Sequence, residues 1–247
     1  MSILLLHGDA EARLLADAEL AIQAVLPDRE VQLIRAWTTR PDWLDSAAPG
    51  PPAALRRRGM VEDRDARELL EQPHRLVIFC LLPVVAMRAM THRAGGVFLA
   101  HEGLCANWSP EDAAVVAAEC ATQSPLSPKD AARAFEPIID RLQRRGAAVA
   151  ISTAFRHVNE PLQHRQPAGP PPLRELIRRT NLEVARLSHR TGCFVLDLDR
   201  ALAQEGGGPL EADCFGGAGR AAELAIEELA ALIVDALPDE LMPTEAL

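Results

Sequence analysis

The sequence predicts an α/β fold, a three-layer α/β/α sandwich with a mostly parallel, doubly wound sheet of about five or six strands. Short apolar runs alternate with longer segments of helical periodicity along the whole chain. The apolar residues are mainly Ala, Leu, Val and Ile, which suit helices packed on a buried sheet. No polar linker divides the 247 residues, so we expect one domain over 1–237 and a loose tail over 238–247.

Five apolar runs are expected to form buried strands, because continuous apolar runs are typical of parallel strands covered on both faces. They lie at 3–6, 31–36, 75–82, 147–152 and 193–198. A further short run at 97–100 is expected to add a strand. Strands joined through helices pair in parallel by right-handed crossovers, so their carboxyl ends meet at one edge of the sheet.

Helices are expected between these strands. Ser109 and Ser127 are each followed by Pro and by an acidic residue three positions on, which is a helix start with Ser as the N-cap. Gly146 and Gly192 are expected to end the two long helices. The helical patterns lie at 15–25, 54–70, 84–91, from 109, from 127, at 173–189 and at 219–237.

The charge balance excludes some partners. A formal net charge of −9 argues against nucleic acid and against an anionic membrane surface as partners. Between Arg156 and Arg190 the chain is locally basic, with seven Arg against three Glu. Such a run is either a solvated helix face or a surface for an acidic ligand. We therefore expect a small-molecule substrate or ligand, and the oligomeric state stays open.

The five cysteines contain no Cys-x-x-Cys pair and predict neither a disulfide framework nor a zinc finger. Cys80 and Cys193 lie inside apolar runs and are expected in the core. A reducing compartment, the cytoplasm, fits this usage. The first apolar run indicates a strand rather than a signal peptide, and no stretch approaches the ~20 apolar residues of a membrane span.

Polar segments follow the strands at the edge where ligands bind in such sheets. His7-Gly8-Asp9-Ala10 ends the first strand, and Asp213-Cys-Phe-Gly216 precedes the last helix. In order and spacing these segments resemble the SGNH/GDSL hydrolase family, which places Gly-Asp-Ser and Asp-x-x-His there. The resemblance implies the SGNH fold and hydrolysis or transfer of an ester or acyl group.

The matched motifs depart from the family at two positions. Ala10 stands where the resemblance implies the nucleophilic Ser, and Gly216 stands where it implies the general-base His. Asp9 and Asp213 match. A Ser-His-Asp mechanism needs the nucleophile and the base within hydrogen-bond reach, so the triad is degenerate. The family's Gly-x-Asn-Asp segment is also missing after 75–82.

Other polar residues at predicted strand ends complete the candidate site. The candidate catalytic residues are Asp9, His7, His101, His157 and Asp213. The candidate ligand-binding residues are Gly8, Ala10, Glu102, Asn107, Arg156 and Asn159. No dense metal-ligand spacing and no Gly-x-Gly-x-x-Gly motif occurs, so we expect neither a metal nor a cofactor.

Three functions remain open at this point. The first is an SGNH-like enzyme acting on an ester, acyl or related bond of a small molecule through a non-standard site. The second is a catalytically inactive relative that binds a small ligand or a partner protein. The third is a metal-assisted hydrolase or lyase on a similar fold, with His and carboxylate side chains at the strand ends.

Overall fold

The computed structural model describes residues 1–8, 14–44, 66–87, 89–93, 97–99, 109–154, 173–204 and 220–238. A five-stranded parallel sheet forms its centre, and the strand order is β2-β1-β3-β7-β8. The strands are β1 (Ser2–His7), β2 (Gln32–Trp37), β3 (Leu76–Cys80), β7 (Ala148–Ser152) and β8 (Phe194–Leu196). The predicted α/β sandwich with a doubly wound sheet is confirmed.

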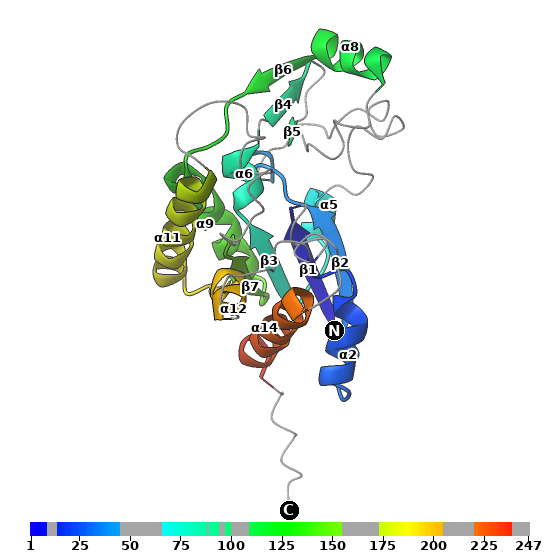
Figure 1. The fold of residues 1–247 in the computed structure, drawn as a ribbon, viewed down its shortest axis with the longest axis vertical. Coiled ribbons are helices and arrows are strands. Elements are labelled where there is room, and N and C mark those ends of the chain that lie inside the picture. Colours follow the sequence, from blue (N-terminus) through cyan, green and yellow to red (C-terminus); the bar gives the residue numbers. More distant parts are fainter. Residues whose placement is uncertain are drawn as a thin grey trace, which may run out of the picture.

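Alternate side chains of the strands enter two separate cores, because successive residues of a strand face opposite sides of a sheet. Leu4 and Leu6 of β1 pack on one side, and Ile3 and Leu5 pack on the other. Figure 1 shows the helices that cover these two faces. The first face is covered by α3 (Pro41–Leu44), α5 (Ala66–Leu70), α6 (Leu82–Ala86), α9 (Pro128–Arg144) and α11 (Leu173–Thr191). The second is covered by α2 (Ala18–Val25), α12 (Leu198–Gln204) and α14 (Arg220–Ala236).

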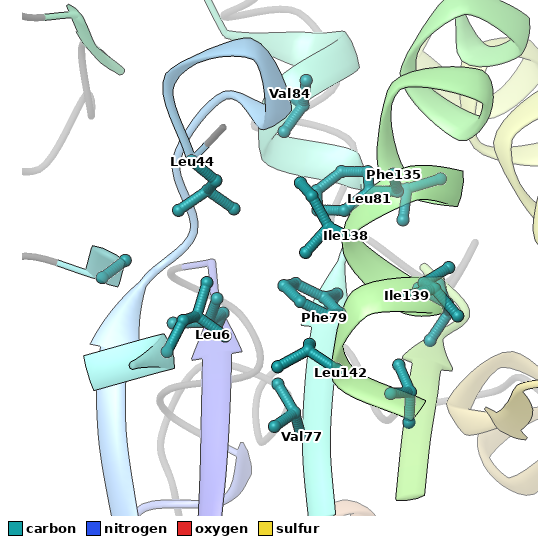
Figure 2. Close-up of a cluster of buried hydrophobic side chains, with 14 of the residues drawn as sticks. Leu6, Leu44, Val77, Phe79, Leu81, Val84, Phe135, Ile138, Ile139 and Leu142 are labelled. Atoms are coloured by element: carbon teal, nitrogen blue, oxygen red, sulfur yellow. The ribbon is translucent and has the colours of Figure 1, made fainter. Parts of the chain in front are cut away.

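Helix α9 carries the centre of the first core, as its periodicity predicts. Figure 2 shows Phe135, Ile138 and Leu142 of α9 beside β3, and the Phe135 and Phe79 rings lie 5.0 Å apart between centroids and are tilted by 56°. Tilted aromatic pairs at this separation have favourable quadrupole geometry. The buried apolar residues of α9 are Ala131, Ala132, Phe135, Ile138, Ile139 and Leu142.

The predicted helix ends are confirmed. The Ser109 hydroxyl accepts a hydrogen bond from the Asp112 N–H at 3.1 Å at the start of α8 (Pro110–Glu119). Ser127 caps α9 in the same way. Gly146 and Gly192 follow α9 and α11 with φ values of 84° and 70°, a left-handed conformation that suits Gly.

A second, antiparallel sheet was not predicted. It has the order β5-β4-β6 and contains β4 (Ala89–His92), β5 (Val97–Leu99) and β6 (Cys120–Gln123). We call it the small sheet. Figure 1 shows it with α8 beyond the carboxyl ends of the central strands. The helix expected at 84–91 was wrong after residue 86, because pairing between distant segments outweighs the local pattern of so short a run.

Smaller expectations have mixed outcomes. Cys80 and Cys193 are buried, as predicted. The helical pattern expected at 15–25 contains α2, in which Ala18 and Ile22 are buried and Val25 is 55% exposed. Of the helix expected at 54–70, the described part holds only α5. No helix among the described residues has the length and apolar character to cross a membrane.

Candidate functional site

A row of polar and aromatic side chains lies at the carboxyl ends of the central strands, which we call the carboxyl edge. His7 of β1 is paired in register with Trp37 of β2, and Cys80 of β3 is paired with Ser152 of β7. Leu6 is paired with Phe79, which brings His7 and Cys80 to the next position along β1 and β3. By the alternation of a strand, the row faces the side covered by α2 and α14. Parallel α/β sheets bind ligands at this edge.

His7 is a buried imidazole with a defined proton position. Its side chain is 6% exposed, and its Nδ1 lies 3.1 Å from the Gly8 carbonyl oxygen. A carbonyl oxygen only accepts hydrogen bonds, so Nδ1 carries the proton and Nε2 keeps its lone pair. Among the described residues Nε2 has no hydrogen-bond partner. The lone pair on Nε2 is therefore available to a ligand or a water that donates a hydrogen.

The environment of His7 keeps the ring neutral. Burial lowers the pKa of His7 from 6.5 to about 4. The Gly8 carbonyl opposes this shift of the pKa, and the charge of Arg35 adds to it. The Trp37 ring lies 5.1 Å away and is tilted by 58°, so an aromatic neighbour replaces water on one side. At neutral pH His7 therefore offers a lone pair and no positive charge.

Thr38, which follows β2, joins the ends of three strands. Its N–H donates to the His7 carbonyl oxygen at 2.9 Å. Its hydroxyl lies within hydrogen-bond distance of the carbonyl oxygens of Leu6, at 3.1 Å, and Cys80, at 3.2 Å. The backbone that positions His7 is thus fixed from the β2 side. Nothing in the sequence marks this Thr, since one Thr in a loop carries no pattern.

A second polar network fixes the ends of β7 and β8. The side-chain amide of Asn181 in α11 pairs with both backbone groups of Ala154, accepting from its N–H at 2.9 Å and donating to its carbonyl oxygen at 2.7 Å. Thr153 donates to the Asp197 carboxylate at 3.0 Å and accepts from the Asp199 N–H at 3.0 Å. Asp197 also accepts from the Arg200 N–H in the first turn of α12 at 3.2 Å, as a helix N-cap does.

Of the predicted site residues, the structure describes His7 and Gly8, and it brings them into contact. The others lie outside the described residues: Asp9, Ala10, His101, Glu102, Asn107, Arg156, His157, Asn159 and Asp213. Their places in the site stay predictions. Within the described ranges no three His, Cys, Asp or Glu side chains gather as a metal site would require.

The basic run is a solvated helix face where the structure describes it. On α11, Arg179 bonds Glu175 at 2.9 Å and Arg186 bonds Glu183 at 2.6 Å. Arg190 bonds Glu136 of α9. The Arg179–Glu175 and Arg190–Glu136 pairs are exposed, and such pairs contribute little to stability, typically about 0–1 kcal/mol, whereas Glu183 is buried. Each of these Arg side chains already has an acidic partner, which favours the solvated face over a surface for an acidic ligand.

No protein-family model matches the sequence, and no curated protein matches it. Solved structures do resemble it. An acetyl-xylooligosaccharide esterase from Geobacillus stearothermophilus is 10% identical, with 98% of this chain and 95% of that chain covered and a TM-score of 0.51. LAE5, an α/β hydrolase from the metagenome of Lake Arreo, is 10% identical, with 95% and 94% covered and a TM-score of 0.51. A candidate SGNH hydrolase from Slackia heliotrinireducens covers 94% of this chain at 12% identity, with a TM-score of 0.47.

At such identities the likeness concerns the fold. The chain has an α/β/α fold like that of these esterase and α/β hydrolase structures. The expected fold resemblance is therefore confirmed. Which residues act, and on what, is a separate question.

Proposed function

We propose that this protein is an SGNH-like hydrolase or acyltransferase that acts on an ester or acyl bond of a small molecule through a non-standard site at the end of β1. The observation that carries the proposal is the His7 imidazole, buried at the carboxyl edge with its lone pair on Nε2. The hydrolase-type fold supports the class of reaction.

In this proposal His7 orients the attacking water or hydroxyl group by accepting its hydrogen at Nε2. With a pKa of about 4, His7 is a weak base and does not keep that proton at neutral pH. The proton's destination is the alkoxide that leaves the ester, and Asp9, two residues on in the sequence, is a further proposed catalytic residue. His101, His157 and Asp213 are the further proposed catalytic residues.

The acyl oxygen becomes negative during attack and needs hydrogen-bond donors. Asn107, Arg156 and Asn159 are the proposed donors to the substrate, with Gly8, Ala10 and Glu102 as further contacts. These roles are inferred from the sequence, and mutagenesis of each residue tests them.

The test is hydrolysis of p-nitrophenyl acetate and butyrate by the full chain, by His7→Phe and by Asp9→Asn. His189→Gln, at an exposed position on α11, is the matched control. We expect turnover in the wild type and control, and a loss of at least about tenfold in each site variant, the usual size for acid–base groups. Wild-type turnover that survives in His7→Phe would remove His7 from the mechanism.

The second candidate is a catalytically inactive relative that binds a small ligand. Ala10 and Gly216 favour it, because they replace the two residues that do the family's chemistry. The double variant Ala10→Ser, Gly216→His separates the two candidates. Turnover that appears only in this variant supports the inactive relative, whereas turnover in the wild type supports the enzyme. Repeating the assay with a chelator tests metal-assisted hydrolysis.

A further inference from the structure

The buried polar side chains at the carboxyl edge use their hydrogens inside the protein. The Ser152 hydroxyl donates to the Cys80 sulfur at 2.9 Å, and the Thr38 hydroxyl donates to main-chain carbonyl oxygens. Thr153 donates to Asp197. His7 donates its one ring hydrogen to the Gly8 carbonyl oxygen. What His7 retains for a ligand is an acceptor.

Two cations are close in sequence to this row. Arg40 is buried, and its Nη1 donates to the Ser124 carbonyl oxygen at 3.4 Å. Arg35 directs its Nη2 to the Ala16 carbonyl oxygen at 2.7 Å. Each guanidinium group thus directs one of its donors to a main-chain carbonyl oxygen, and the Nε of Arg35 is buried without a partner among the described residues.

We infer that the site at the end of β1 selects a ligand group that donates a hydrogen bond to His7 Nε2, an uncharged hydroxyl above all, and disfavours an oxyanion there. A lone pair attracts an O–H or N–H hydrogen and repels a carboxylate or phosphate oxygen. The inference rests on the proposed function for the location of the site, and it names a free hydroxyl, that of the attacking water, an acceptor alcohol or the alcohol product, as the group that contacts His7.

The selectivity has a physical reason in the burial of His7. A site built around a buried polar group rejects a ligand that leaves the group unpaired, and this rejection is stronger than that of an apolar pocket. Because the ring stays neutral over the physiological pH range, it cannot turn into a donor for an anion.

Three small probes separate the possible ligand groups. 1-Butanol has a donor hydroxyl, methyl propyl ether is its isomer without a donor, and butyrate is an oxyanion of similar length. The measurement is the ¹⁵N chemical shift of His7 Nε2 in the labelled full chain during titration with each probe. His74 is an internal control, because Ser2 Oγ at 2.9 Å and the Leu69 carbonyl oxygen at 2.7 Å occupy its two ring nitrogens.

We expect 1-butanol to move the Nε2 resonance of His7 and to leave His74 unchanged, with at least tenfold weaker effects from the ether and butyrate. His7→Phe should abolish the difference between the probes, and His7→Gln, whose Oε1 is an acceptor, should restore part of it. Equal or stronger binding of butyrate or the ether, a proton found on Nε2, or no response to 1-butanol would each overturn the inference.

The outcome is separable from that of the proposed reaction. Selective binding of 1-butanol without any ester hydrolysis would retain the inference and refute the enzyme. Ester hydrolysis that depends on His7, without preference among the three probes, would retain the enzyme and refute the inference.

Discussion

The Thr38 hydroxyl lies 3.2 Å from the carbonyl oxygen of Cys80, so a residue that follows β2 reaches across β1 to the end of β3. The same hydroxyl lies 3.1 Å from the Leu6 carbonyl oxygen. One buried side chain therefore ties the strand that carries His7 to the strands on both of its sides.

Thr38→Val should lower the free energy of unfolding by about 1–3 kcal/mol, because it leaves buried carbonyl oxygens without their donor in a side chain of nearly the same shape. Thr39→Val is the control, since the Thr39 hydroxyl has no hydrogen bond within the described part of the chain. Urea denaturation of both variants measures the difference. Equal stability of the two would show that the Thr38 bonds contribute nothing net.

The pH dependence of stability should report the burial of His7. The pKa of His7 is about 4 in the folded protein and 6.5 as a free side chain, so the unfolded state binds more protons between these values. Stability therefore falls as the pH drops from 6.5 to 4, by about 3 kcal/mol for this group. His7→Phe lacks the titrating group and should lose less stability over this range. Denaturation curves at several pH values compare the two proteins, and identical slopes would contradict the burial of a neutral ring.

The two hydrogen bonds between the Asn181 side chain and the Ala154 backbone should govern local stability at the end of β7. Asn181→Asp retains the acceptor for the Ala154 N–H but loses the donor to the Ala154 carbonyl oxygen and places a carboxylate beside it. We expect a loss of about 1–3 kcal/mol and faster hydrogen exchange of the Ala154 amide. Leu182→Ala, at an exposed neighbour on the same helix, should change stability by no more than about 0.5 kcal/mol. An unchanged hydrogen-exchange rate of the Ala154 amide in Asn181→Asp would show that these two hydrogen bonds do not stabilise the end of β7.

The Phe79–Phe135 pair should contribute beyond the burial of each ring. Phe135→Ala is expected to cost about 3–5 kcal/mol, because both rings are fully buried between β3 and α9. A double-mutant cycle with Phe79→Leu should give a coupling energy of about 0.5–1.5 kcal/mol. Additive effects of the two changes would mean that the tilted geometry brings no specific gain.

The central sheet was predictable because its strands are continuous apolar runs, and α9 was predictable because Phe135, Ile138 and Leu142 repeat at helical spacing. The starts of α8 and α9 were predictable from Ser109 and Ser127, because an N-cap bonds to its own helix and needs no distant partner. Strands β4 and β6 were missed because each has four residues, and their pairing depends on a partner about 30 positions away.

The candidate site was predictable only where a strand ends in a recognisable segment. His7 and Gly8 were found because they end the first apolar run, but the contacts that define their chemistry were not foreseeable. Trp37 and Thr38 reach His7 through strand pairing, and Asn181 reaches Ala154 from a different helix. Such contacts arise from the tertiary fold, and a single polar residue forms no sequence pattern from which they could be predicted.

The small sheet also affects how the protein reaches its native state. Cys80 and Ser152, paired neighbours in the central sheet, are separated by 72 residues in the sequence, and all three strands of the small sheet lie within that interval. Closing so long a loop costs chain entropy before the β3–β7 contacts compensate for it. We therefore expect this pairing to form late and slowly during folding, with the edge of β3 open to other chains until β7 arrives.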